Sequence, residues 1–193
     1  SRRQRQMCIR DSIKRDKYLN DLINRMHNGM IKVVTGIRRC GKSYLLFNIF
    51  KNYLLEQGVP ASHIIMIELD QRKNKKYRDP DVILDYIESL IEEDGQYYIM
   101  LDEVQMLQEF EEVLNSLLHI RNADVYVTGS NSKFLSKDVI TEFRGRGDEI
   151  HIYPLTFKEF MEAYDGDMYH GWAEYVVYLS LIHISEPTRL QLI

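Results

Sequence analysis

The sequence predicts an α/β fold in which a mostly parallel sheet of five strands lies between two layers of helices, a three-layer sandwich. Three observations support this. Short apolar runs alternate along the chain with segments of helical period. Hydrophobic residues make up 45% of the 193 residues, which is enough for a buried core. Glycine and proline are not enriched, so the composition is not that of a disordered chain.

The strands are predicted from short runs rich in β-branched and other apolar residues, bounded by turn-forming residues. They cover residues 30–35, 64–69, 97–101, 124–128 and 149–153.

The helices are predicted from apolar residues spaced three and four apart. They cover residues 13–26, 42–57, 80–94, 110–118, 133–143 and 157–163, the fifth with the weakest pattern. Two of them have clear start signals. Asp79 is a suitable N-cap with Pro80 at the first helical position, and Thr156 with Glu159 has the spacing of a capping box. Gly95 ends the third helix.

The segment between the first strand and the second helix, Gly36-Ile37-Arg38-Arg39-Cys40-Gly41-Lys42-Ser43, matches the pattern of a P-loop. Gly36 lets the chain leave the strand sharply, and Gly41 lets backbone N–H groups approach phosphate oxygens. Lys42 supplies a positive charge for the β- and γ-phosphates, and the Ser43 hydroxyl is a ligand for Mg²⁺. The position between an apolar strand and an amphipathic helix is the context that this motif requires.

The whole loop is therefore assigned to ATP. The predicted contacts are Gly36, Arg38, Arg39, Cys40, Gly41, Lys42, Ser43 and Tyr44. For Arg38 and Arg39 a solvated loop face stays an alternative to phosphate contact. Cys40 is interpreted either as a redox-sensitive thiol or as a residue at a permissive position of the loop.

A second motif follows the third strand, where Tyr97-Tyr98-Ile99-Met100-Leu101 runs into Asp102-Glu103. This is a Walker B pattern. Asp102 is predicted to hold Mg²⁺, and Glu103 to orient and polarise the water that attacks the γ-phosphate.

A complete strand-helix unit, residues 64–93, separates the two motifs. That insertion, with an acid directly after Asp102, is typical of the additional-strand catalytic-glutamate group of P-loop NTPases. The strand order expected for that group is 5-1-4-3-2. The end of the fourth strand then lies beside the phosphate site, so Ser130 and Asn131 are candidate sensors of the γ-phosphate. A plain turn is the alternative.

Four segments together resemble one family: GIRRCGKS, LDEVQ, TGSNS and RGRGDEIHIYPLTFKEF. It is the family of prokaryotic AAA-type ATPases that pair an N-terminal P-loop domain with a poorly characterised C-terminal domain. The resemblance implies ATP binding and hydrolysis. It also implies a role for the recurrent Gly-Arg pair, here Gly145-Arg146, in which Arg146 stabilises γ-phosphate charge in cis or from a neighbouring subunit. A surface arginine paired to Asp148 or Glu149 is the alternative.

Both ends of the chain resemble translated sequencing-adapter read-through. We therefore expect residues 1–12 and 180–193 to be non-native tails around an ATPase core at residues 13–179, cut before the lid and C-terminal domain of the family. Cys8 and Cys40 are the only cysteines, which fits a reducing cytoplasm better than a disulfide framework.

The predicted function is Mg²⁺-dependent hydrolysis of ATP by a molecular switch or motor acting on an unknown protein or DNA client. A homo-oligomer is possible for the longer protein, and no membrane partner is expected, since no apolar run is long enough to span a bilayer. The alternative is a nucleotide-dependent DNA- or protein-binding module with little turnover. The net charge of −4 gives no general argument for nucleic acid, and the basic segment 71–78 is interpreted as a solvated loop. The guanine signature N/T-K-x-D is absent, which argues against a GTPase.

Overall fold

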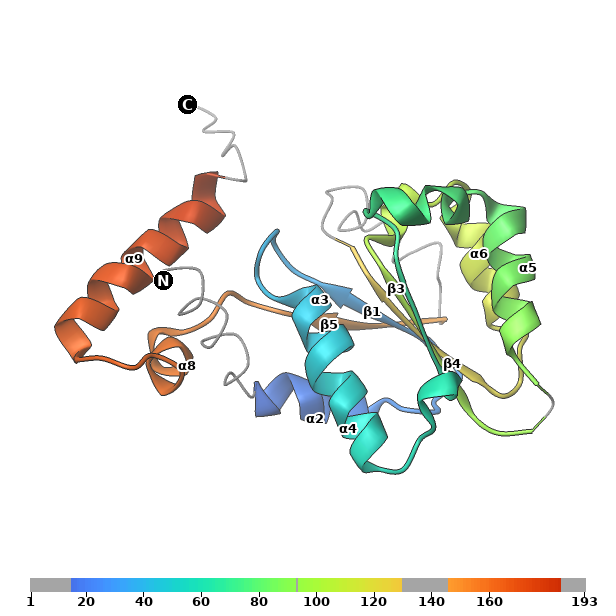
Figure 1. Ribbon diagram of the computed structural model, residues 1–193, viewed down its shortest axis with the longest axis horizontal. Helices are drawn as coiled ribbons and strands as arrows, with labels where there is room; N and C mark the ends of the chain where they lie inside the picture. The colour runs from blue at the N-terminus through green and yellow to red at the C-terminus, as the bar shows by residue number, and fades with distance from the viewer. Residues whose placement is uncertain (1–14, 93, 130–145, 185–193) are drawn as a thin grey trace.

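The computed structural model describes residues 15–92, 94–129 and 146–184. Its centre is a five-stranded parallel sheet in the order β2-β3-β4-β1-β5 (Figure 1). The strands are β1 (Ile31–Thr35), β2 (Ile64–Glu68), β3 (Tyr97–Asp102), β4 (Ala123–Thr128) and β5 (Gly147–His151). The predicted order 5-1-4-3-2 is confirmed.

The position of β1 determines where a site can form. β1 pairs in parallel with β4 on one side and with β5 on the other, with Val33 opposite both Val127 and Glu149. β4 pairs in turn with β3, and Leu101 lies opposite Val127. In this arrangement the carboxyl ends of β1, β4 and β3 meet at one edge of the sheet, where α/β proteins bind their ligands.

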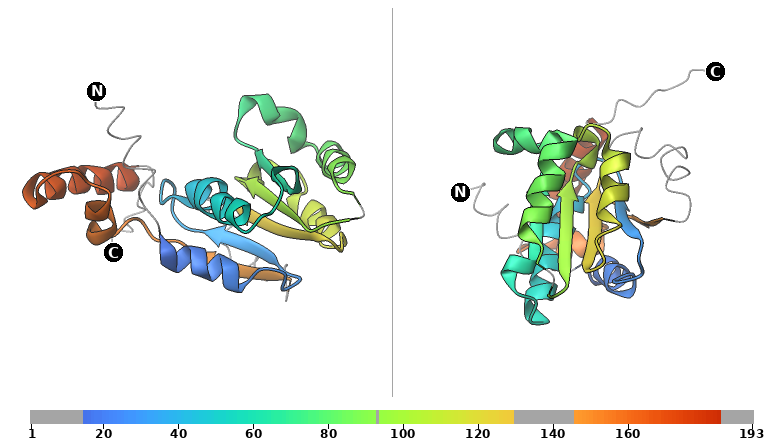
Figure 2. Two further views of the ribbon diagram at one scale, coloured as in Figure 1. Left: turned by 60° about the horizontal axis from the view of Figure 1, so that its bottom comes forward. Right: turned by 90° about the vertical axis from the view of Figure 1, so that its right-hand side faces the viewer.

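Helices cover both faces of the sheet, which confirms the predicted three layers (Figure 2). Alternate residues of β3 show the division, because Ile99 and Leu101 belong to one core and Tyr98 and Met100 to the other. The first core is closed by α5 (Pro80–Leu90) and α6 (Phe110–Leu117). The second is closed by α2 (Asp16–Asn24) and by the helix that follows the P-loop.

The helix after the P-loop is not uniform. It consists of α3 (Lys42–Tyr44), a π-helical stretch at Leu45–Phe50, and α4 (Lys51–Glu56). The predicted helix at residues 42–57 is therefore correct in extent. Its wider middle turn was not predicted, and π-helical turns are frequent next to functional sites.

The predicted helix starts agree with the structure. The Asp79 side chain accepts hydrogen bonds from the N–H groups of Asp81 and Val82, at 3.1 and 3.2 Å. At the start of α8 (Phe157–Glu162), the Thr156 hydroxyl accepts from the Glu159 N–H and the Glu159 carboxylate accepts from the Thr156 N–H. Both caps satisfy backbone donors that the first turn of a helix leaves unpaired.

Four segments differ from the sequence-based expectation. Helix α5 ends at Leu90, four residues before the predicted end at residue 94. The basic segment expected as a loop forms a 3₁₀ helix, Arg72–Arg78. A long helix, α9 (Met168–Ile184), follows α8 where no helix was predicted. The last strand lies two residues earlier than residues 149–153. The weak helix expected at residues 133–143 lies outside the described residues. Within the described ranges, no helix has the length and apolar character to cross a membrane.

A buried ion pair joins β1 to β4 inside the second core. The Lys32 ammonium donates to one carboxylate oxygen of Asp124, and neither side chain is more than 5% exposed. The other oxygen accepts from the Tyr126 hydroxyl at 2.7 Å and from the His27 N–H at 3.0 Å. Burial, together with the nearby Asp124 carboxylate, raises the pKa of Tyr126, so the phenol keeps its proton and acts as a donor. A charge taken out of water is tolerated only with such complete pairing.

Replacing Asp124 by Asn is expected to destabilise the fold strongly, because Lys32 then keeps its charge in the core without a counter-ion. We expect a loss of roughly 3–5 kcal/mol in the free energy of unfolding, measured by urea denaturation. Asp21→Asn is the control, since Asp21 forms a partly exposed pair with Arg25 at 3.6 Å. That substitution should cost less than about 1 kcal/mol. Equal losses in the two variants would contradict the assignment.

Candidate nucleotide site at the carboxyl edge of the sheet

The P-loop leaves β1 through a turn that only glycine fits. Gly36 has φ of 143° and Gly41 has φ of 99°, both in the range that residues with a side chain rarely adopt. A Cβ added at Gly36 would collide with the backbone carbonyl of Ile152 and lie 2.9 Å from the Cys40 sulfur. At Gly36 the loop is therefore packed tightly against the segment that follows β5, and this position has no room for a side chain.

Lys42 lies across this loop instead of extending into solvent. Its side chain is buried, and the ammonium nitrogen donates to the carbonyl oxygens of Gly36 at 2.8 Å and Ile37 at 3.0 Å. The loop thus surrounds a positive charge held by its own backbone. The lysine of the P-loop motif is thus held inside the loop that the motif assigns to phosphate.

Three strand and helix ends meet at the Asp102 carboxylate, which is the last residue of β3. One oxygen of Asp102 accepts from the Ser43 hydroxyl at 2.9 Å, and the same oxygen accepts from the Thr128 hydroxyl at the end of β4. Burial raises the pKa of the Asp102 carboxyl, and these two hydrogen bonds act against that rise. The two donors therefore help to keep a buried carboxylate charged.

Glu103 follows in a backbone conformation that is unusual for a residue with a side chain, with φ of 53° and ψ of 50°. Its N–H donates to the Thr128 hydroxyl at 3.0 Å, so Thr128 contacts both acidic residues. The Gln105 side-chain amide donates to the Glu103 carboxylate. The turn and the two contacts fix where the carboxylate lies, at the edge that also carries Ser43 and Asp102.

A family model described as an AAA domain matches residues 28–161, which include every element of this site. The chain belongs to the AAA domain family. The resemblance to AAA-type P-loop ATPases is thereby confirmed, and the family supports nucleotide binding and ATPase activity in general terms.

Two uncharacterized proteins are similar to this AAA domain chain. One, from Haemophilus influenzae, is 32% identical over 186 residues, covering 92% of this chain and 46% of the relative. The other, from Methanocaldococcus jannaschii, is 29% identical over 154 residues, covering 77% of this chain and 32% of the relative. The chain thus spans less than half the length of either relative.

Among solved structures, the AAA domain fold is similar to the Aeropyrum pernix ORC1 protein in complex with DNA, with 14% identity and a TM-score of 0.55. That match covers 83% of this chain and 49% of the other. The S. cerevisiae Hsp104:casein complex matches with 14% identity and a TM-score of 0.56, covering 88% of this chain and 31% of that one. At such identities the similarity concerns the fold alone.

The remaining P-loop positions of this AAA domain differ in exposure. The Arg38 and Arg39 side chains are exposed, whereas Cys40 is buried and Tyr44 is half-buried. Burial raises the pKa of the Cys40 thiol, which lowers its reactivity. Of the two interpretations of Cys40, burial therefore argues against the redox-sensitive thiol.

Arg146 does not lie with the other predicted residues of the AAA domain site. It directly precedes β5, and its carbonyl accepts from the N–H of Ile31, the first residue of β1. The P-loop begins at the other end of β1, roughly 16 Å away for five residues of strand. The Arg146 guanidinium instead donates to Asn115 of α6 at 2.9 Å, which is neither of the acids named as alternative partners. Of the two predicted roles of Arg146 at the γ-phosphate, this position does not support the contact in cis. Ser130 and Asn131 lie outside the described residues.

Sequence reasoning missed Thr128 and Gln105. Thr128 stands two residues before the sensor candidate Ser130, in a segment that was already considered, but only the strand order brings its hydroxyl to Asp102. Gln105 lies in the LDEVQ segment that carried the family resemblance, and its position two residues after Glu103 was the available signal.

Replacing Thr128 by Val is expected to raise the pKa of Asp102 further, because the substitution removes a hydrogen bond that stabilises the charged carboxylate. The titration midpoint of Asp102, followed by carboxyl ¹³C NMR, should move to higher pH than in the wild type. Thr35→Val is the matched control, since Thr35 lies in the neighbouring strand and donates to Glu149 at 2.5 Å. An unchanged or lower midpoint for Thr128→Val would show that the hydroxyl does not support the carboxylate.

Proposed function

We propose that the chain binds ATP with Mg²⁺ and hydrolyses it to ADP and phosphate, and that this reaction drives a switch or motor. The observation that carries the proposal is the meeting of Ser43, Asp102 and Thr128 at one carboxylate oxygen, with Glu103 next to it. A P-loop hydroxyl joined to a strand-terminal carboxylate is the arrangement that P-loop ATPases use for their metal and nucleotide.

The loop residues fit the phosphates of a nucleotide. Gly36 and Gly41 keep the backbone free of Cβ atoms, so that N–H groups reach an anion directly. Lys42 exchanges its contacts with the Gly36 and Ile37 carbonyls for contacts with the β- and γ-phosphates. The N-terminus of the following helix adds its partial positive charge.

The Ser43 hydroxyl and the Asp102 carboxylate fit Mg²⁺, because both offer oxygen ligands and lie 2.9 Å apart. Bound Mg²⁺ would neutralise negative charge on the β- and γ-phosphate oxygens. Asp102 then keeps its charge more easily, since a nearby cation opposes the effect of burial on its pKa. Thr128 holds the carboxylate in place from β4.

Glu103 is the proposed general base. It accepts a proton from the attacking water and orients that water toward the γ-phosphate. Thr128 holds the backbone of Glu103 in place, and Gln105 holds its carboxylate. These two contacts restrict the position of the carboxylate that would accept the proton. Ser130 and Asn131 are proposed to contact the γ-phosphate or the same water.

Assembly and client belong to the proposal as well. Because Arg146 is held at the opposite end of β1, its role at the γ-phosphate requires a neighbouring subunit of a homo-oligomer. The proposed client is a protein or DNA. The alternative is a nucleotide-dependent binding module with little turnover. It uses the same phosphate site, but in it Glu103 does not activate water for hydrolysis.

One experiment separates hydrolysis from binding. Glu103→Gln should keep the affinity for ATP and Mg²⁺ but reduce turnover about 100-fold or more, since it removes the base and leaves the phosphate contacts. Binding is measured by calorimetry and turnover by phosphate release. Glu112→Gln, an exposed glutamate on α6, is the control and should behave as the wild type. Equal turnover in wild type and Glu103→Gln would exclude the base, and low turnover in both would favour the binding module.

The phosphate site has its own test. Lys42→Ala removes a charge that P-loops place on the β- and γ-phosphates, so ATP affinity should fall roughly ten- to a hundred-fold. Lys17→Ala, an exposed lysine of α2, is the matched control. Normal ATP affinity in Lys42→Ala would exclude the assigned phosphate site.

A further inference from the structure

Arg15 is a buried charge that the motifs do not explain. It directly precedes α2, before the residues matched by the family model, and only 5% of its surface is exposed. It adopts the left-handed conformation, with φ of 45°, which is strained for a residue with a side chain. A buried arginine held in a strained conformation is retained only by specific contacts.

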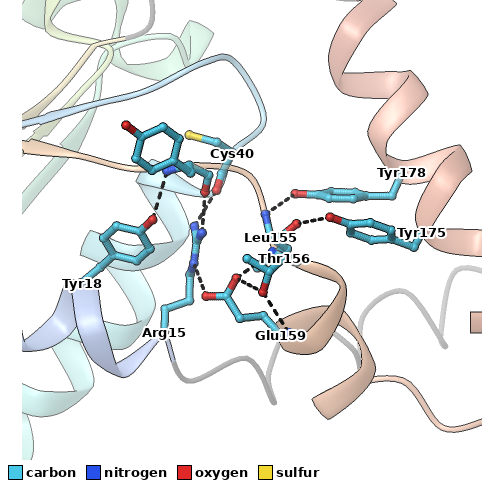
Figure 3. Close-up of polar contacts among 9 residues, drawn as sticks. Arg15, Tyr18, Cys40, Leu155, Thr156, Glu159, Tyr175 and Tyr178 are labelled. Carbon is cyan, nitrogen blue, oxygen red and sulfur yellow. Dashed lines mark hydrogen bonds and ion pairs between the residues drawn. The ribbon is translucent and has the colours of Figure 1, made fainter. Parts of the chain in front are cut away.

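Those contacts join two segments that are far apart in sequence (Figure 3). Nη1 of Arg15 donates to the carbonyl of Cys40 in the P-loop at 2.7 Å, and Nη2 donates to the carbonyl of Tyr153 after β5. The guanidinium carbon lies 4.6 Å from the ring centre of Tyr18, and Nε lies 3.8 Å from the Glu159 carboxylate of α8. The planar guanidinium therefore fixes the distance between the P-loop and the start of α8.

The contact with Cys40 has a direct consequence for phosphate binding. The Cys40–Gly41 peptide is trans, so its carbonyl and the following N–H point in opposite directions. Because Arg15 donates to the carbonyl oxygen of this peptide, the Gly41 N–H faces away from Arg15. A Cβ added at Gly41 would lie 3.3 Å from Nη1, so the guanidinium packs directly against the loop from its outer side. The N–H is thus turned toward the inner side, where the loop binds anions.

The second contact continues to α9. The backbone of residues 153–155 is held by α2 on one side, where the Tyr18 hydroxyl accepts from the Tyr153 N–H at 3.2 Å. It is held by α9 on the other side. The Tyr175 hydroxyl donates to the Leu155 carbonyl at 2.7 Å, and the Tyr178 hydroxyl accepts from the Leu155 N–H at 3.4 Å. Arg15 therefore connects the Cys40–Gly41 peptide to the segment that anchors α9.

We propose that Arg15 is a positioning residue of the phosphate site: it orients the Gly41 N–H through the Cys40 carbonyl and couples that peptide to α9 through Tyr153. This inference rests on the proposed ATP site. In this proposal Arg15, a residue outside the motifs, contributes to the affinity for phosphate. It also connects phosphate binding to the position of α9.

Trp172 makes the coupling measurable, because it is the only tryptophan of the chain and lies on α9. Its ring packs edge-on against Phe157 of α8 at 5.0 Å, and it is 6.0 Å from Tyr175. Its fluorescence therefore reports on the packing of α8 against α9. In the wild-type chain of 193 residues, ATP with Mg²⁺ should change this emission.

The central test is Arg15→Lys, which keeps the charge but loses the planar fork that reaches both carbonyls. We expect the Kd for ATP, measured by calorimetry, to rise roughly ten- to a hundred-fold. The Trp172 response should be lost even at saturating ATP, which a loss of stability alone would not cause. Arg25→Lys is the matched control, an arginine directly after the same helix that pairs with Asp148 at 2.8 Å, and it should behave as the wild type.

Two further variants keep the test decisive. Tyr178→Phe removes the contact with Leu155 but not the contact with Cys40, so ATP affinity should be unchanged and the Trp172 response reduced. Glu159→Gln keeps a residue that can cap α8 but removes the negative charge beside Arg15. If Arg15→Lys does not fold, this variant tests the positioning role of Arg15 in its place. Glu159→Gln should weaken both ATP binding and the Trp172 response.

The outcomes distinguish this inference from the proposed function. The role of Arg15 is overturned if Arg15→Lys shows wild-type ATP affinity and a wild-type Trp172 response. If Arg15→Lys does not fold, the same result in Glu159→Gln overturns it. Either result leaves the proposed ATP site intact. A full Trp172 response in Tyr178→Phe overturns the coupling to α9. A wild-type chain that does not bind ATP overturns the proposed function and this inference with it.

Discussion

The parallel alignment of β3, β4 and β1 is the constraint on which the site depends. Side by side, these strands carry Asp102, Thr128 and the start of the P-loop to one edge of the sheet. The Thr128 hydroxyl can donate to Asp102 and accept from the Glu103 N–H only because β4 lies between the other two strands. A different strand order would leave the same residues in the sequence without a common site.

The alignment is itself supported from the interior. A shift of β1 by one residue against β4 would turn every side chain of the strand to the opposite face. Lys32 and Asp124 oppose such a shift, because their buried charges are paired in only one register and would be separated in any other. The ion pair lies near the start of β1 and β4, whereas the phosphate loop follows the end of β1. We interpret the pair as a device for specificity of register more than for stability, since buried pairs add little net stability over apolar packing.

The features that could be predicted from the sequence are those formed by residues close together along the chain. The spacing of Gly36, Gly41 and Lys42 and the acids at the end of β3 are read along the chain, and the inserted strand-helix unit was enough to predict the strand order. Thr128, Arg15 and the Lys32–Asp124 pair could not be found in this way, because their roles arise from partners 25 or more positions distant. Helix α9 was missed for another reason: apolar residues lie on all its sides, so it lacks the one-sided period from which helices are recognised.

The contacts of Lys42 have a consequence for which ligands the loop accepts. Its ammonium is already bound by two carbonyl oxygens, so the loop carries an internal competitor for the anion. Binding is then an exchange of partners and not the capture of an unsatisfied charge. In the proposed phosphate site, a ligand with a single weak anionic group would offer too little in return to displace these two backbone contacts. A chain of phosphates would engage the ammonium and several N–H groups together, so the proposed site would select ligands by the number of anionic oxygens that they bring at once.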